Sequence, residues 1–107
     1  MAAIHINNEQ FQEMIAAEIP VLVDFWAPWC SYCRRIDPAY NRIAEQFEGR
    51  ITAAKVNIDE EVQLADAEGI DIIPTLALYH KGKLLSSITA PDSKAAIERF
   101  LQDALPQ

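Results

Sequence analysis

The stretch VLVDFWAPWCSYC, residues 21–33, places the two cysteines of the chain directly after a strand pattern. Residues 21–26 are almost wholly apolar, which is typical of a strand covered by helices on both faces. A short connection leads to Cys30, where a helical pattern begins, and Cys33 follows one turn later. This stretch therefore predicts a buried strand that delivers two thiols to the start of a helix.

The elements around this stretch alternate between helix and strand patterns. A first helical pattern starts at Asn8 and is broken by Ile19-Pro20, and others run over residues 30–47, 60–68 and 93–104. Strand patterns run over residues 4–6, 51–58, 75–79 and 83–89, the last two joined by a tight turn at Lys81-Gly82. Asn8 is the expected N-cap of the first helix, and Asp92 or Ser93 that of the last. This order predicts a single three-layer α/β/α domain over residues 1–107, with a mixed sheet of about five strands and with four helices.

Composition and charge limit the classes of partner. The chain has 107 residues and a formal net charge of −7, which argues against an electrostatic grip on nucleic acid or anionic lipid. Residues 1–10 lack the basic start and apolar core of a signal peptide, and no apolar run is long enough to cross a bilayer. We therefore expect a cytoplasmic protein, in a compartment that keeps thiols reduced. We also expect it to be a monomer.

The spacing of Cys30 and Cys33 suits a disulfide that opens and closes. A helical rise of about 1.5 Å per residue and a Cα radius of about 2.3 Å put the two Cα atoms roughly 5 Å apart. Disulfides accept about 4.4–6.8 Å. The first cysteine faces solvent at the helix N-terminus, where unpaired N–H groups and the helix dipole stabilise a thiolate. Because the thiolate is the nucleophile, Cys30 is the expected attacking sulfur and Cys33 the resolving one.

Two other interpretations of the cysteine pair have less support. Zinc needs four ligands, and His5 and His80 are isolated residues in separate strand patterns, so no metal site is predicted. A purely structural disulfide across so short a loop restricts the unfolded chain little and adds little stability. The residues favour a redox-active dithiol.

Asp24 and Lys55 are charged residues inside otherwise apolar strand patterns. Burial would raise the pKa of the Asp24 carboxyl, and the strand direction places it near the cysteines, where it could exchange a proton with Cys33. The alternative is a carboxylate that reaches solvent or caps a loop. Lys55 either pairs with Asp24 and lowers the pKa of Asp24, or extends its ammonium group to the surface, the commoner fate of a lysine.

Trp29 and Tyr32 flank the first cysteine and are either core residues or exposed aromatics. Two aromatic side chains beside a solvent-facing thiol favour a surface that docks a partner. Ile73-Pro74 leads into a later strand. From general frequencies its peptide bond is expected to be trans, because only about 5–6% of X–Pro bonds are cis.

The motifs VDFWAPWCSYC, RIDP, VNID, IPT and KGK occur in this order along the chain. Together they resemble the thioredoxin family over nearly the whole length. The resemblance implies helices on both faces of a mixed sheet and, against the general frequency, a cis bond between Ile73 and Pro74, with Pro74 facing the cysteines. The roles that it implies are Cys30 as nucleophile, Cys33 as resolving thiol, Asp24 as buried acid–base group, Lys55 as the partner of Asp24, and Trp29, Ile73 and Pro74 as the surface for an extended substrate strand.

Two places depart from the family pattern. Ser31 and Tyr32 stand between the cysteines, where the family usually has Gly-Pro, and are the expected determinants of the reduction potential. Thr89 stands where the family usually has a glycine beside the substrate, in a loop expected to be one residue longer. As N-cap, a Cys30 thiolate is expected to accept from the N–H of Tyr32 or of Cys33, and Tyr32, unlike proline, has an N–H group to donate. We therefore expect a dithiol somewhat more oxidising than the roughly −270 mV of thioredoxin.

The sequence thus predicts an enzyme, a thiol-disulfide oxidoreductase that reduces protein disulfides. No bound cofactor is required, because the Cys30–Cys33 pair is itself the redox centre. The resemblance implies electrons from NADPH through a separate thioredoxin reductase, so that disulfide-containing proteins and this reductase are the expected partners. Two alternatives stay open at this point: an oxidase or isomerase with the same chemistry, and a redox-sensing module whose dithiol switches a binding interface.

Overall fold

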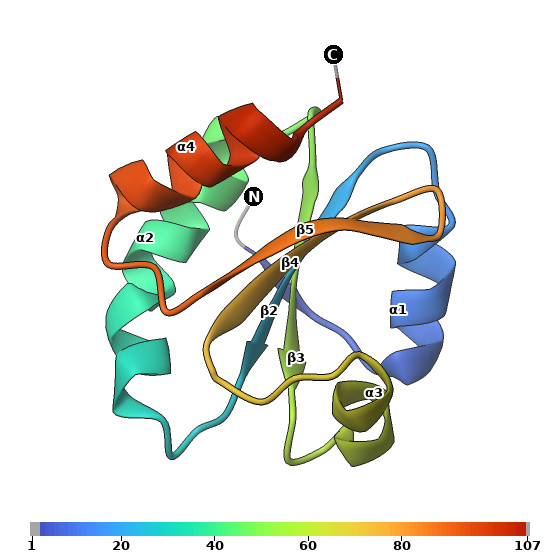
Figure 1. Ribbon diagram of the computed structural model, residues 1–107, viewed down its shortest axis with the longest axis vertical. Coiled ribbons are helices and arrows are strands. Elements are labelled where there is room, and N and C mark those ends of the chain that lie inside the picture. The colour runs from blue at the N-terminus through green and yellow to red at the C-terminus, as the bar shows by residue number, and fades with distance from the viewer. Residues whose placement is uncertain (1–2, 107) are drawn as a thin grey trace.

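The structure, a computed structural model, describes residues 3–106 and builds one sheet between two layers of helices (Figure 1). The strands are β1 (Ile4–His5), β2 (Val21–Trp26), β3 (Thr52–Asn57), β4 (Thr75–His80) and β5 (Lys83–Thr89). The helices are α1 (Asn8–Ile15), α2 (Ser31–Gln46), α3 (Val62–Ala67) and α4 (Lys94–Ala104). The element order and the α/β/α architecture confirm the prediction from the sequence.

Strand β2 lies at the centre of the sheet, whose order is β1-β3-β2-β4-β5. It runs parallel to β3, with Asp24 opposite Lys55, and antiparallel to β4, with Asp24 opposite Leu76. β1 is parallel to β3, whereas β5 is antiparallel to β4. The sheet is therefore mixed, and both edges of β2 are hydrogen-bonded to a neighbour.

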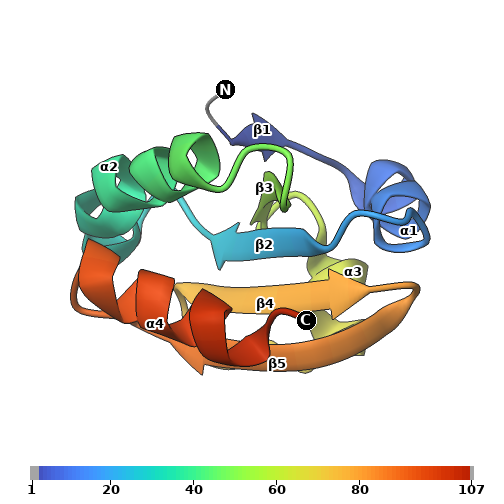
Figure 2. The ribbon, with the colours of Figure 1, turned by 90° about the horizontal axis from the view of Figure 1, so that it is seen from above.

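Helices cover both faces of this sheet, and Figure 2 shows α2 and α4 on one side with α1 and α3 on the other. Side chains of β2 alternate between the two layers. Leu22 packs in the core with α2 and α4, whereas Val23 and Phe25 pack in the core with α1 and α3. By this alternation Asp24 points toward α2 and α4. The apolar run at residues 21–26 is thus buried on both faces, as expected.

The N-cap of α1 is Asn7, not Asn8 as expected. The Asn7 side chain accepts a hydrogen bond from the backbone N–H of Gln10 at 2.9 Å, and the Gln10 side chain accepts one from the N–H of Asn7 at 2.9 Å. Only Asn7 stands three residues before a glutamine that can complete this reciprocal capping box. Ser93 caps α4 by accepting from Ala96 N–H at 3.1 Å, so of the two candidates Ser93 is the cap.

The hairpin between β4 and β5 has the predicted two-residue turn. Lys81 and Gly82 have φ angles of 52° and 81°, respectively. Positive φ at both central residues matches the twist of the flanking strands, and glycine adopts it without steric cost. The turn places β5 at the edge of the sheet, where Thr89 lies opposite Thr75.

Tyr40 fastens α2 to the two central strands. Its side chain is fully buried, and its hydroxyl oxygen lies 2.9 Å from the carbonyl of Leu22 on β2 and 2.8 Å from that of Ala54 on β3. The hydroxyl therefore donates between two strand carbonyls. Burial is the largest cause that raises the pKa of Tyr40 well above its usual value, so the phenol stays neutral and able to donate.

Replacing Tyr40 with phenylalanine should lower the free energy of unfolding by about 1 kcal/mol, because it removes this buried donor and keeps the ring. Urea denaturation of both proteins at one fixed pH measures the difference. The slope with denaturant should not change, since the exposed surface is the same. An unchanged midpoint in Tyr40→Phe would show that the hydroxyl does not fasten the helix.

Candidate active site

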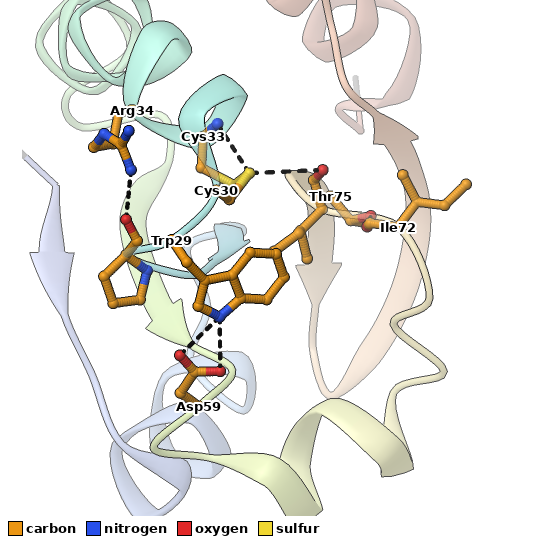
Figure 3. The surroundings of a disulfide bond; sticks show 9 residues. Trp29, Cys30, Cys33, Arg34, Asp59, Ile72 and Thr75 are labelled. Atoms are coloured by element: carbon orange, nitrogen blue, oxygen red, sulfur yellow. Dashed lines mark hydrogen bonds between the residues drawn. A yellow bond between two sulfur atoms is a disulfide. The ribbon is translucent and has the colours of Figure 1, made fainter.

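The two cysteines form a disulfide at the start of α2 (Figure 3). Cys30 is the N-cap of the helix, and its Sγ accepts a hydrogen bond from the backbone N–H of Cys33 at 3.1 Å. The Cα atoms lie 5.3 Å apart, as the helical spacing predicts. Cys30 is 8% exposed and Cys33 is 2% exposed. Of the two sulfurs, that of Cys30 therefore lies nearer to solvent.

The N–H group that reaches Cys30 is that of Cys33, not that of Tyr32. The expectation of a more oxidising potential depends on a contact from Tyr32 to a thiolate. In the disulfide form the donor at 3.1 Å is Cys33, whose N–H would remain if residue 32 were proline. Any effect of Tyr32 through its N–H group must therefore arise in the reduced protein.

Trp29 is held beside the disulfide with most of its surface open. Its side chain is 65% exposed, and its indole Nε1 donates to both carboxylate oxygens of Asp59, at 3.0 and 3.2 Å. Figure 3 shows the indole with its nitrogen turned to Asp59. Asp59 follows the end of β3, and Trp29 follows the end of β2. A residue beyond one strand therefore orients the indole ring beyond the neighbouring strand. The prediction of an exposed aromatic beside the cysteines is confirmed for Trp29.

The segment before β4 faces the disulfide. The peptide bond Ile73-Pro74 is cis, as the family resemblance implies, and the expectation of a trans bond is wrong. The general preference for trans amounts to only about 0.5–1 kcal/mol, so the tertiary surroundings decide the isomer. The carbonyl oxygen of Ile73 lies 4.0 Å from Cys30 Sγ. Pro74 is buried, whereas Ile73 is half-buried.

Tyr32 joins the first turn of α2 to the loop between β5 and α4. Its hydroxyl donates to the carbonyl oxygen of Pro91 at 2.9 Å, and its ring is half-buried. Next to Pro91, Ala90 has a φ angle of 45°, in the left-handed region that favours glycine. Thr89 is an ordinary exposed residue of β5. The loop therefore requires glycine-like geometry at Ala90, one residue after the position that the sequence singled out.

Asp24 is a fully buried carboxyl group. Among residues 3–106 neither of its oxygens has a hydrogen-bond partner. Burial is the largest influence and raises the pKa of Asp24 to about 7, while the positive charge of Lys55 lowers it and the negative charge of Asp37 raises it further. The alternative of a carboxylate that reaches solvent or caps a loop is therefore wrong.

Lys55 is buried and binds a residue other than Asp24. It is 7% exposed, so it is not a surface lysine. Its ammonium group donates to the carboxylate of Asp37 on α2 and lies 4.7 Å from the centre of the Trp26 ring. Lys55 thus acts on Asp24 through its charge and not through a hydrogen bond. Asp37 and Asp59 are residues of the site that sequence reasoning missed, although Asp37 stands four residues after Cys33 in the motif RIDP.

Fold and site together define the class of protein: an enzyme that exchanges two electrons through one cysteine pair, a thiol-disulfide oxidoreductase. Comparison with known proteins supplies the family. The thioredoxin family model matches residues 2–103, and the chain belongs to the thioredoxin family.

Several proteins named thioredoxin are similar over almost the whole chain. Thioredoxin 1 of Nostoc sp. is 40% identical over 105 residues, covering 97% of this chain and 98% of its own. Thioredoxin of Porphyra purpurea is 37% identical, covering 94% and 95%, respectively. A solved chain from a study of the thiol resolving mechanism of yeast mitochondrial 1-Cys peroxiredoxin superposes with a TM-score of 0.84 at 22% identity, covering 94% of each chain, which shows the shared fold.

Neither a metal cluster nor a membrane-spanning helix is found between residues 3 and 106. In this part of the chain no three side chains of His, Cys, Asp or Glu gather as metal ligands. No helix of the same residues is long and apolar enough to cross a membrane. The redox chemistry of the family needs no cofactor, so the disulfide pair is the redox centre.

The buried Asp24 should make stability depend on pH. Its folded pKa of about 7 lies above the ordinary value near 4, so the folded state holds the proton more tightly than the unfolded state. This preference contributes its full share to the free energy of unfolding below about pH 4. The contribution falls as the pH rises from about 4 to about 7, and above about pH 7 it stays lost. The loss amounts to about 4 kcal/mol.

Asp24→Asn removes this titration, so the difference in unfolding free energy between variant and parent should grow in favour of the variant by about 4 kcal/mol from about pH 4 to about pH 8. Urea denaturation of both oxidised proteins across this range measures it. Taking the difference cancels the other carboxyl groups. A difference that stays constant with pH would refute the raised pKa.

Proposed function

We propose that this protein is a reductase of protein disulfides that works as a cytoplasmic monomer, with residues 1–107 acting as one thioredoxin-like domain. Its electrons are supplied from NADPH by a separate thioredoxin reductase. Membership of the thioredoxin family supports this direction of electron flow. The observation that carries the proposal is the position of Cys30, whose sulfur caps a helix and lies beside the open indole of Trp29.

The first step is the attack of the Cys30 thiolate on a substrate disulfide. A bond forms between Cys30 Sγ and one substrate sulfur, the substrate S–S bond breaks, and the second substrate sulfur leaves as a thiolate. The N–H of Cys33 and the positive end of the 16-residue helix α2 stabilise the thiolate that begins this step. The product is a mixed disulfide between the protein and its substrate.

The second step releases the substrate. The Cys33 thiol gives its proton to Asp24, directly or through a water molecule, and the resulting thiolate attacks Cys30 Sγ. The Cys30–Cys33 bond forms, the mixed disulfide breaks, and the substrate leaves with two electrons more than it brought. A base with a pKa of about 7 suits this task, because it is part ionised at neutral pH and regains the proton readily.

The substrate binds across the surface around Cys30. Trp29 supplies an exposed aromatic face, and Ile73 brings a half-buried apolar side chain and a backbone carbonyl 4.0 Å from the Cys30 sulfur. Pro74 and Thr89 complete the proposed surface: Pro74 follows Ile73, and Thr89 lies opposite Thr75 at the start of β4. The Tyr32 hydroxyl joins α2 to the Pro91 loop. An extended substrate strand can place its backbone beside that of Ile73, as strands do at a sheet edge.

The reduction of insulin by NADPH and thioredoxin reductase tests this function. The protein should turn over insulin disulfides, and Cys30→Ser should abolish turnover because the nucleophile is lost. Cys33→Ser should accumulate a mixed disulfide with the substrate, visible on a non-reducing gel, since the resolving thiol is lost. Refolding of scrambled disulfides without any reductase turnover would instead indicate an isomerase, and inactivity in both assays would contradict an enzyme.

We also propose that Tyr32 and Ser31 set the reduction potential, with the Tyr32 N–H acting on the thiolate of the reduced protein. Tyr32→Pro should then make the dithiol more reducing by a few tens of millivolts, because it removes one donor. Tyr32→Phe is the matched control, since it keeps the N–H and removes only the hydroxyl. Equilibration against glutathione measures all three potentials. A potential of the parent at or below about −270 mV would contradict the proposal.

A further inference from the structure

Three charged side chains meet between the sheet and α2: Asp24 on β2, Lys55 on β3 and Asp37 on α2. Asp24 and Lys55 are register partners on adjacent strands, so their side chains lie on the same face. Two carboxyl groups thus share one ammonium group. In a layer that excludes water, a single cation compensates only one negative charge well, and the second carboxyl group is driven toward its protonated form.

The structure shows which carboxyl group holds the cation. The Lys55 ammonium donates to Asp37, whereas neither oxygen of Asp24 has a partner among the described residues. Exposure to solvent explains why Asp37 is the ionised carboxyl group and Asp24 the protonated one. The side chain of Asp37 is 35% exposed and that of Lys55 is 9% exposed, while Asp24 is completely buried. Ionisation costs less free energy for Asp37, which keeps some contact with water, than for Asp24. The proton therefore stays on Asp24.

Helix α2 brings this arrangement next to the cysteines. Asp37 follows Cys33 by four residues, so the two side chains are neighbours on the same face of the helix. Tyr40, one turn further, also faces the sheet and donates to strand carbonyls. His5 of β1, the register partner of Lys55, is a further titratable group on this face of the sheet, and its ring contacts that of Trp26 at 5.6 Å between centroids. From β4 and α4 this layer receives the apolar side chains Leu76, Ile97 and Leu101.

We propose that Asp37 is a positioning residue of the active site: it binds the Lys55 ammonium and so keeps that cation from neutralising the Asp24 carboxyl group. The side chain of Asp37 binds Lys55, so it acts on the reacting thiol through Asp24 and not directly. It sets the pH at which Asp24 can accept a proton from Cys33, so the inference rests on the proposed role of Asp24. The pKa of Asp24 thus depends on a residue of α2 that is partly exposed to solvent.

The titration of the Asp24 carboxyl carbon, followed by NMR in the oxidised protein, tests this proposal directly. The parent should titrate near pH 7. Asp37→Asn removes one negative charge and frees Lys55 to pair with Asp24, and both effects stabilise the Asp24 carboxylate. The midpoint should therefore fall by about one pH unit or more. Asp37→Glu, which keeps the carboxylate, should bring the midpoint back toward that of the parent.

Two further variants make the test specific. Asp103→Asn, on the exposed surface of α4, changes the net charge equally and should leave the Asp24 midpoint unchanged. Lys55→Gln should raise the midpoint, and in that background Asp37→Asn should have a smaller effect, since the cation through which Asp37 acts is gone. If Asp37→Asn shifts the midpoint no more than Asp103→Asn does, the proposal is overturned.

A kinetic measurement separates this inference from the proposed function. The rate at which a mixed disulfide on Cys30 is resolved by Cys33 should rise with pH through the midpoint of Asp24, and the rise should move to lower pH in Asp37→Asn. A fall in the Asp24 midpoint supports the positioning role whatever the kinetics show. If the midpoint falls while the pH profile stays fixed, the positioning role stands and the acid–base role of Asp24 fails.

Discussion

The placement of β2 is the constraint on which the site depends. This strand is hydrogen-bonded along both edges and covered by helices on both faces, so every side chain from Val21 to Phe25 is buried. The alternation of a strand leaves no solvent-facing side for a polar residue. Asp24 is consequently held in the interior, and the chain that leaves the strand carries Cys30 to the start of a helix on the same side. β2 thus holds the buried acid, and the connection that follows it places the disulfide at the start of α2.

In this buried position the negative charge of an ionised Asp24 is only partly compensated, by the ammonium group of Lys55. Asp24 without any cation would be a neutral acid across the whole physiological range, and with a tightly bound cation it would be a permanent anion. The Lys55 ammonium lies close enough to Asp24 to act on it through its charge, but it binds Asp37 and lies over the Trp26 ring. As a result, the pKa of the Asp24 carboxyl group lies near 7, between these two extremes. An isolated ion pair on the surface would produce no such intermediate state, because water would screen it.

Much of this arrangement is predictable from the sequence, because it follows from local patterns. The apolar run of β2, the glycine in the β4–β5 turn and the spacing of the cysteines each have one physically favoured outcome. What escaped prediction depends on competition between alternatives. Asn7 displaced Asn8 as N-cap because of Gln10, and the left-handed backbone of Ala90 was not predicted. Lys55 met two carboxylates, and only the packing of α2 on the sheet shows which one it binds. The cis bond at Pro74 likewise followed from family resemblance and not from general frequencies.

The hydrogen bond from Tyr32 to the Pro91 carbonyl connects parts of the chain that are 59 residues apart. The two residues between the cysteines, Ser31 and Tyr32, form a short cassette. Here the cassette and a distant loop form one unit, because the phenol needs a carbonyl at one particular place and the loop reaches that place through the unusual backbone of Ala90. A dipeptide grafted without its loop would carry the side chain but not its acceptor. Exchange of such cassettes therefore changes the shape of the surface beside Cys30 along with the surroundings of its sulfur.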